Sequence, residues 1–83
     1  MACKVVFLST AVKDLSALPG EARIRIAAAL RDLQEFPNGR GIKKLKAPFG
    51  GFRKRVGDYR ILFDVEQNIL SVHRIKNRKD AYR

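Results

Sequence analysis

The chain has 83 residues, of which 18 are lysine or arginine and 8 are aspartate or glutamate, so its formal net charge at pH 7 is +10. A chain of this length is expected to form one hydrophobic core, and we therefore expect a single domain over residues 1–83. The hydrophobic fraction of 46% is ordinary for a folded domain and argues against a disordered basic tail.

Several classes of protein are excluded by what the chain lacks. The single cysteine, Cys3, has no partner for an intrachain disulfide, and together with the single histidine, His73, it matches no zinc spacing. The longest apolar run is far shorter than the roughly 20 residues that span a bilayer, and the first residues do not resemble a signal peptide. We therefore expect a cytoplasmic protein without a metal, a cofactor or a membrane.

The charge is unevenly distributed along the chain. Residues 1–38 hold five bases and four acids, whereas residues 39–83 hold thirteen bases and four acids, so the net charges are +1 and +9. A surface that serves only solubility is usually mixed in sign, so this segregation indicates a polyanionic partner for the second half, with nucleic acid as the leading candidate.

The first half predicts a strand followed by two helices. Residues 4–8 are apolar and β-branched, as in a strand, and Ser9 or Thr10 is then expected to supply an N-cap oxygen. A first helix runs to Pro19-Gly20. The second begins at Glu21 and ends within residues 36–39, and one stripe of its surface is apolar. The stripe consists of Ala22, Ile26, Ala29, Leu30 and Leu33.

The second half predicts a hairpin whose register follows from its turn. Gly57-Asp58 suits a two-residue turn, because glycine tolerates a positive φ angle. Counting outward pairs Val56 with Tyr59 and, at the far end, Phe52 with Phe63. Side chains alternate between the faces of a sheet, so the apolar residues share one face and Arg53, Arg55 and Arg60 the other. The apolar face consists of Phe52, Val56, Tyr59, Ile61, Phe63 and Val65, with Lys54 as an exception that must reach out to solvent or mark a bulge.

The last predicted strand, residues 69–75, has an ambiguous alternation. Either Leu70 and Val72 or Ile69 and Ile75 face the core. The elements together predict an α+β fold, in which an N-terminal strand and an antiparallel helix hairpin pack on a mainly antiparallel sheet of about four strands.

The residues leave little room for most catalytic chemistry. No Ser-His-Asp or Cys-His set is plausible with a single histidine, and no glycine-rich phosphate loop precedes a helix. A cluster of guanidinium groups remains, and such a cluster binds phosphates and can stabilise the charge of a phosphoryl transition state. RNA supplies its own nucleophile, the 2′-hydroxyl. Lys54 is a candidate base if neighbouring cations lower its pKa, and binding without catalysis stays open.

Two motifs point to a known family. Val56-Gly57-Asp58-Tyr59-Arg60 lies within residues 44–63, and Arg78-Lys79-Asp80-Ala81-Tyr82-Arg83 forms the end of the chain. In these motifs and in the order of its predicted elements, the chain resembles the RelE/ParE toxin superfamily, and the likeness covers nearly its whole length.

The resemblance implies a toxin of a type II toxin–antitoxin pair. RelE-like members are metal-independent endoribonucleases that cut mRNA in the ribosomal A site by 2′-hydroxyl attack and so inhibit translation. The implied partners are mRNA on the ribosome and an acidic, RelB-like antitoxin, with operator DNA bound only through the antitoxin complex. Two alternatives stay open: a ParE-like inhibitor of DNA gyrase, and a catalytically weakened module that binds only antitoxin and operator.

The resemblance also implies roles for individual residues. Lysines stand in the best-studied sites where this chain has Arg53 and Arg55, and many relatives have a histidine at the position of Asn77, so the general base is not identified. The residues implied to be catalytic are Arg53, Arg55, Arg60, Arg78 and Tyr82. Those expected to bind RNA are Lys44, Lys46, Lys54 and Lys79.

Overall fold

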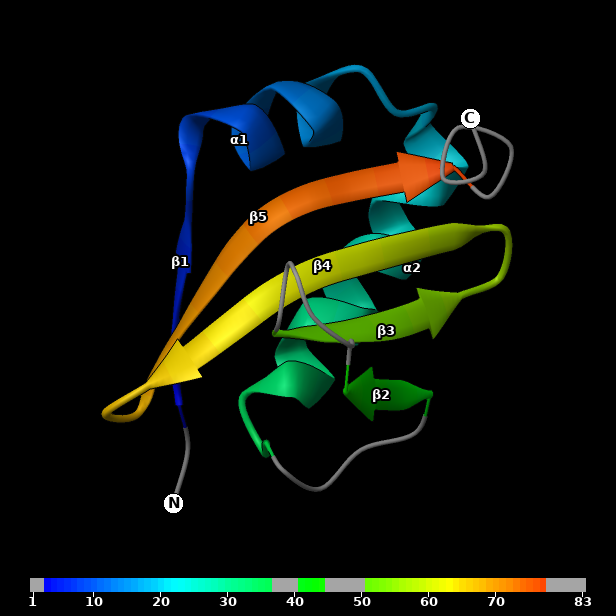
Figure 1. Ribbon diagram of the computed structural model, residues 1–83. Coiled ribbons are helices and arrows are strands. Elements are labelled where there is room, and N and C mark those ends of the chain that lie inside the picture. Colours follow the sequence, from blue (N-terminus) through cyan, green and yellow to red (C-terminus); the bar gives the residue numbers. More distant parts are fainter. Residues whose placement is uncertain (1–2, 37–40, 45–50, 78–83) are drawn as a thin grey trace.

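A five-stranded sheet forms the centre of the computed structural model, which describes residues 3–36, 41–44 and 51–77 (Figure 1). Its strand order is β1-β5-β4-β3-β2, with β1 and β5 parallel and all other neighbours antiparallel. The elements in chain order are β1 (Lys4–Phe7), α1 (Ser9–Ser16), α2 (Gly20–Leu33), β2 (Ile42–Lys44), β3 (Phe52–Val56), β4 (Tyr59–Glu66) and β5 (Ile69–Asn77). The predicted α+β class is confirmed, and β2 is a fifth strand that the sequence did not indicate.

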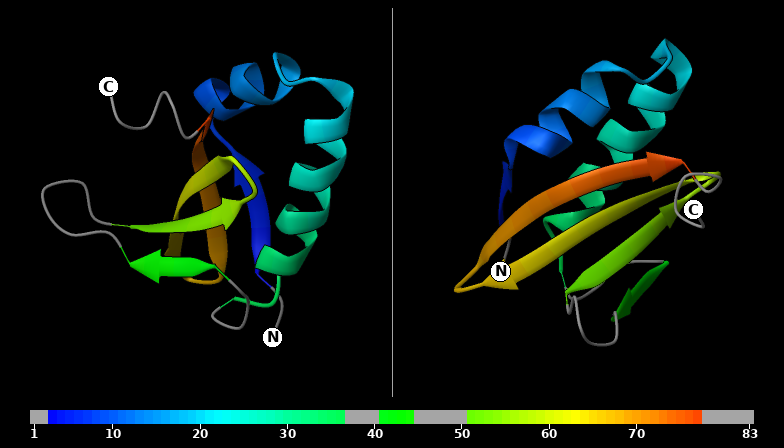
Figure 2. Two further views of the ribbon diagram at one scale, coloured as in Figure 1. Left: turned by 90° about the vertical axis from the view of Figure 1, so that its right-hand side faces the viewer. Right: turned by 45° about the horizontal axis from the view of Figure 1, so that its top comes forward.

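Helix α2 lies along one face of the sheet and provides five of the twelve buried hydrophobic residues in the described part of the chain (Figure 2). The five residues of the predicted apolar stripe are the five buried residues of this helix. They pack against the inward side chains of β4 and β5, of which Ile61, Phe63, Leu70 and Val72 are at most 1% exposed. Neither α1 nor α2, the helices of the described part, is long and apolar enough to cross a membrane.

The β3–β4 hairpin has the predicted register. Val56 lies opposite Tyr59 and Phe52 opposite Phe63, and Gly57 has a φ of 57° in the turn between the strands. Phe52 and Phe63 stack with their ring centroids 5.7 Å apart, and both rings meet Phe36 edge-on. The hairpin therefore has one apolar side against the helices and one side that points away from them.

A β-bulge settles the register of β5. Leu62 of β4 pairs with Arg74, but the next residue, Phe63, pairs with Val72. His73 is therefore an extra residue that has no partner in the pairing of β5 with β4. The alternative with Leu70 and Val72 in the core is therefore confirmed, and of the other alternative only Ile75 is buried, since Ile69 is 44% exposed. Before the bulge Leu70 and Val72 face the core, and beyond it Ile75 does, because one inserted residue shifts the alternation.

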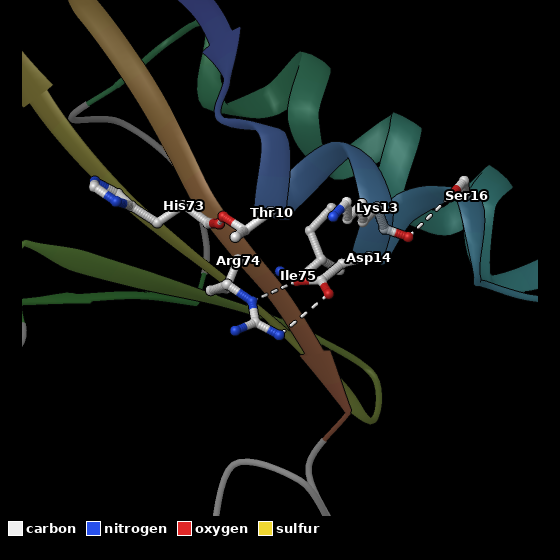
Figure 3. A network of polar contacts seen from close by, with 7 residues as sticks. All are labelled: Thr10, Lys13, Asp14, Ser16, His73, Arg74 and Ile75. Atoms are coloured by element: carbon white, nitrogen blue, oxygen red, sulfur yellow. Dashed lines mark hydrogen bonds and ion pairs between the residues drawn. The ribbon is translucent and has the colours of Figure 1, made fainter.

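Helix α1 closes the edge of β5 that β1 leaves open. Strand β1 pairs with β5 only as far as Phe7 opposite Val72. Beyond that point the Thr10 hydroxyl donates to the His73 carbonyl at 2.7 Å, and the Ile75 N–H donates to the Asp14 carboxylate at 3.0 Å (Figure 3). The expected N-cap by Ser9 or Thr10 is wrong, since Leu8 is the N-cap residue and makes no side-chain cap. The Thr10 hydroxyl therefore forms its hydrogen bond with a backbone carbonyl of β5 and not with a backbone N–H of α1.

Candidate nucleic-acid interface

On strands β2 to β5, the sheet face that points away from the helices carries six cations, which we call the basic face. Two cross-strand rows contain them. In one row Arg55 pairs with Arg60 and Arg60 with Lys76. In the other Lys43 pairs with Arg53, which faces Leu62, which faces Arg74. The basic face consists of Lys43, Arg53, Arg55, Arg60, Arg74 and Lys76.

Like charges in these rows are direct cross-strand neighbours. Their Cβ atoms are therefore expected to lie about 4.5–5.5 Å apart, a spacing at which like charges destabilise a sheet. Arg53 and Arg60 are half-buried, whereas Arg55 and Lys43 are exposed. An anion such as a phosphodiester would relieve this repulsion, and arginine binds it in a bidentate fashion.

A hollow lies beside the two arginines of β3. It has a volume of about 260 Å³ and is lined by Gly41, Ile42, Lys43, Arg53 and Arg55. The Arg55 N–H donates to the Gly41 carbonyl at 3.1 Å, which holds the start of this segment against β3. Gly41 has a φ of 75°, and a Cβ there would lie 3.2 Å from the Arg55 carbonyl oxygen. The hollow thus presents three cations around a space with room for a phosphate group.

Lys54 does not belong to the basic face. It lies between Arg53 and Arg55 in sequence, so alternation turns it toward the helices, where it pairs with Ile42 and Ile61 and is 5% exposed. The prediction that Lys54 binds RNA, or acts as a base beside those arginines, does not fit this placement. Neither alternative expected for Lys54 is confirmed, because the lysine is buried and the register of β3 is regular at this position, without a bulge.

The other predicted site residues divide into three groups. Arg53, Arg55 and Arg60 are brought together on the basic face as predicted. Lys44 is exposed but pairs with Phe52, so it lies on the opposite side of β2 from Lys43. Lys46, Arg78, Lys79 and Tyr82 lie outside the described residues.

Arg74 is anchored to α1. Its Nε donates to Asp14 Oδ2 at 2.8 Å and a second guanidinium nitrogen donates to Oδ1 at 3.2 Å (Figure 3). Partial burial acts to raise the pKa of Asp14. The hydrogen bonds from Arg74 and the Ile75 N–H and the positive charge of Arg74 outweigh it, and the pKa lies below its usual value of 3.8. The same pairing raises the pKa of Arg74.

His73 and Asp64 form a second polar pair on the same side of the sheet. His73 Nε2 lies 2.6 Å from Asp64 Oδ2, and the two side chains are 42% and 52% exposed. His73 falls within the last predicted strand, residues 69–75, and no motif in the sequence marks it as part of a site. It follows the inward Val72 and lies two residues from Ser71, the partner of Asp64, so it is a diagonal neighbour of Asp64 on the outer side. Within the described residues no three His, Cys, Asp or Glu side chains are placed to hold a metal ion.

Comparisons with known proteins agree with this architecture. The toxin RelE3 of Methanocaldococcus jannaschii is 36% identical over 83 residues, covering 95% of this chain and 94% of its own. The toxin–antitoxin complex RelBE2 from Mycobacterium tuberculosis contains a chain with 28% identity and a TM-score of 0.82, over 93% of this chain and 99% of that one. The RelB–RelE antitoxin–toxin complex from Methanococcus jannaschii contains a chain with 34% identity and a TM-score of 0.76. The match covers 93% of this chain and 94% of that one.

The family model described as ParE toxin of type II toxin–antitoxin system, parDE, matches residues 5–82. Its match includes β1, both helices, the hairpin and β5, and so every element that builds the core and the basic face. The resemblance to the RelE/ParE superfamily is thereby confirmed. The chain belongs to the ParE toxin family and is a toxin of a type II toxin–antitoxin system.

Proposed function

We propose that this toxin is an endoribonuclease that cuts mRNA in the ribosomal A site by attack of the RNA 2′-hydroxyl. The observation that carries the proposal is the basic face, in which arginines and lysines are direct cross-strand neighbours. Such pairs cost stability in the free protein and gain from a bound phosphodiester, so their retention on one rigid sheet favours a phosphate-binding role. The relatives named RelE support the same class of activity.

The proposed roles follow from position. Arg55 and Arg60 are opposite each other, so one phosphate group can contact both guanidinium groups. Charge that develops on the phosphoryl oxygens is stabilised there, and the guanidinium groups supply what a metal ion supplies in other nucleases. Arg53 holds the neighbouring phosphate at the hollow of β2 and β3. Arg78 and Tyr82 are proposed to complete the site and Lys46 and Lys79 to bind the RNA backbone.

An acidic, RelB-like antitoxin is the proposed protein partner. The solved relatives from Mycobacterium tuberculosis and Methanococcus jannaschii are complexes of RelE with RelB. A net charge of +10 favours a partner of opposite sign, both for the rate of association and for the choice of partner. Operator DNA is proposed to be bound through the antitoxin in that complex, and the cytoplasm, where mRNA is translated, is the proposed compartment.

A purified translation reaction tests the proposed activity. The toxin is added to programmed ribosomes and, separately, to the same mRNA without ribosomes, and the 5′ ends of the fragments are mapped. We expect cuts in the A-site codon only when ribosomes are present. The matched control is Lys4→Ala on β1, an exposed residue outside the basic face, which should cut like the wild type. No cleavage in either reaction contradicts the proposal.

Inhibition of DNA gyrase is a second candidate, because the matching family model is described as a ParE toxin. A supercoiling assay separates the two functions. Loss of supercoiling without RNA cleavage would favour this candidate, whereas RNA cleavage with undisturbed supercoiling favours the endoribonuclease.

A further inference from the structure

The basic face contains several cations but lacks an evident proton acceptor. Arginine is a poor base at neutral pH because of its very high pKa. Lys54, the lysine between Arg53 and Arg55, is buried on the other side of the sheet. If the 2′-hydroxyl is to be deprotonated by the protein, the group must come from elsewhere. Such a group must be another titratable side chain on the same face of the sheet as Arg53, Arg55 and Arg60.

Asp64 and Glu66 of β4 also lie on that face, but histidine is the residue that most often acts as a general base, and His73 is the only histidine of the chain. The bulge inserts it into β5 between Val72 and Arg74, which pair with successive residues of β4. Its ring lies away from α1, while the Arg74 guanidinium points to Asp14 of that helix (Figure 3). The imidazole therefore lies over the outer side of the sheet, and its 42% exposure leaves it open to a ligand.

The contact with Asp64 sets which ring nitrogen is available. A carboxylate only accepts hydrogen bonds, so a neutral imidazole held at 2.6 Å carries its proton on Nε2 and donates it to Asp64 Oδ2. Nδ1 is then left with a free lone pair. An Asp that orients a His and stabilises the imidazolium formed during the reaction is the arrangement by which histidine serves as a general base in several unrelated hydrolases.

The backbone around the pair is fixed on both strands. On β5 the Thr10 hydroxyl donates to the His73 carbonyl at 2.7 Å. On β4 the Asp64 carboxylate lies against Gly51, where a Cβ would be 2.5 Å from Asp64 Oδ1 and 2.8 Å from the Phe63 carbonyl oxygen. Gly51 has a φ of 78°, which glycine adopts readily. The absence of a side chain therefore permits both this backbone conformation and the close approach of the Asp64 carboxylate. A proton acceptor needs such fixed placement to act on a bound substrate.

The pair is within reach of the basic face. Leu62, the neighbour of Asp64 on the outer side of β4, faces Arg53 on one side and Arg74 beside the bulge on the other. Adjacent strands are about 4.8 Å apart, so roughly 10 Å separates the backbones of β3 and β5. An arginine side chain bridges much of that distance, and an RNA backbone that lies across β3, β4 and β5 contacts both groups.

We propose that His73, oriented by Asp64, is the general base of this toxin; the inference rests on the proposed endoribonuclease function. His73 Nδ1 takes the proton of the 2′-hydroxyl, and the 2′-oxygen forms a bond to phosphorus. The bond from phosphorus to the 5′-oxygen breaks, and that oxygen takes a proton from solvent water. The products are a 2′,3′-cyclic phosphate and a 5′-hydroxyl end, and the imidazolium returns its proton to water.

The charges around the imidazole come from four elements. Asp64 on β4 is in contact with it, and Arg74 follows it on β5, where Asp14 of α1 binds the guanidinium. Arg53 of β3 lies across β4. The contact with the negative Asp64 holds the ring in place, and the cations lie at a greater distance. A bound substrate phosphate neutralises the arginines.

Single-turnover cleavage of ribosome-bound mRNA tests the proposal with His73→Ala, His73→Gln and the control Ser71→Ala, which changes an outer residue of the same strand. We expect both His73 variants to cut about 100-fold more slowly with ribosome affinity unchanged, and the control to cut like the wild type. Added imidazole should restore at least about tenfold of the rate to His73→Ala, a rescue that a merely structural role would not give.

Asp64→Asn separates the orienting role from the base itself. It should slow cleavage about tenfold, because the imidazole remains but loses the carboxylate that orients it and stabilises the imidazolium. Because the chain has one histidine, NMR of the imidazole nitrogens reports on His73 directly in every variant. The Nε2-protonated tautomer should predominate in the wild type and be lost in Asp64→Asn.

The outcomes distinguish the two levels of the proposal. If wild-type toxin cuts no mRNA, the endoribonuclease function fails and the base with it. If the wild type cuts and the folded His73 variants cut at the same rate with the same pH profile, only the role of His73 is overturned. A slow His73→Ala that imidazole does not rescue also overturns it, provided that circular dichroism shows a folded variant.

Discussion

The two sides of strands β3, β4 and β5 follow different rules although they share one backbone. Toward the helices, Ile61, Phe63 and Val72 are at most 1% exposed and contribute through packing. On the other side, their neighbours Arg60 and Asp64 are charged, and they are half-buried and exposed, respectively. Folding and chemistry are thus divided by alternation, and adjacent residues of β4 are expected to have opposite mutational signatures.

Phe63→Ala should give the largest effect on the packed side. Phe63 is 1% exposed and its ring contacts Phe36 and Phe52. Loss of a buried phenylalanine costs about 3–5 kcal/mol, which is a large part of the stability of a small domain. Urea unfolding followed by circular dichroism measures it. Leu62→Ala, one residue away on the outer side, is the control and should lose less than about 1 kcal/mol. Equal losses would contradict the division.

Arg60→Ala should show the reverse signature. Loss of a group that stabilises transition-state charge typically lowers the rate about 100- to 1,000-fold. The free energy of unfolding should change by less than about 1 kcal/mol, because Arg60 is only half-buried and its loss also removes repulsion with Arg55 and Lys76 in its row. Cleavage of ribosome-bound mRNA and urea unfolding are measured on the same sample. A folded variant with wild-type cleavage would remove Arg60 from the site.

Asp14→Ala tests the anchor between α1 and the edge of β5. The carboxylate binds both Arg74 and the Ile75 N–H, so its loss should cost about 1–2 kcal/mol at pH 7 after allowance for the partly exposed guanidinium. The folded-state pKa of Asp14 is below its usual 3.8. Its contribution is therefore present above that pH and is lost as the pH falls through the lower folded value.

Unfolding measured from pH 7 to pH 2 checks the sign of this effect. The difference between wild type and Asp14→Ala should shrink below about pH 4, when the wild-type carboxylate becomes protonated. A difference that is constant over the whole range would show that the ion pair contributes nothing.

Thr10→Val should give the smallest effect. The substitution keeps the shape of the side chain but removes the hydroxyl that donates to the His73 carbonyl, at a cost of about 0.5–1.5 kcal/mol. Ser16→Ala is the matched control in the same helix, since the Ser16 hydroxyl bonds only the Lys13 carbonyl within α1. If Thr10→Val is no worse than this control, the strand edge does not depend on α1.

The sequence predicted most where a local rule governs the structure. The turn at Gly57-Asp58 fixed every pair of the hairpin, and helical periodicity identified all five buried residues of α2. Both depend on contacts near in sequence. The arginines of the basic face followed from the hairpin register alone, which is why three predicted site residues come together.

The failures occur where distant contacts decide. Strand β2 has three residues and one large apolar side chain, too few for an alternation to be seen, and it forms because β3 offers a free edge. The bulge at His73 depends on how β5 pairs with β4 and contacts α1, and no local sequence pattern marks its position. The helix cap failed for a similar reason, because the Thr10 hydroxyl serves a residue 63 positions away.

The pairing of β1 with β5 has a consequence for how the chain folds. Lys4 lies opposite Ile69 and Phe7 opposite Val72, so the first strand finds its partner only after some 65 further residues have been synthesised. Pairing between such distant segments slows folding, since a long loop must close before the contacts stabilise it. On a nascent chain β1 therefore stays unpaired until Val72 is available. The sheet that carries the basic face is therefore complete only after β5 has been synthesised.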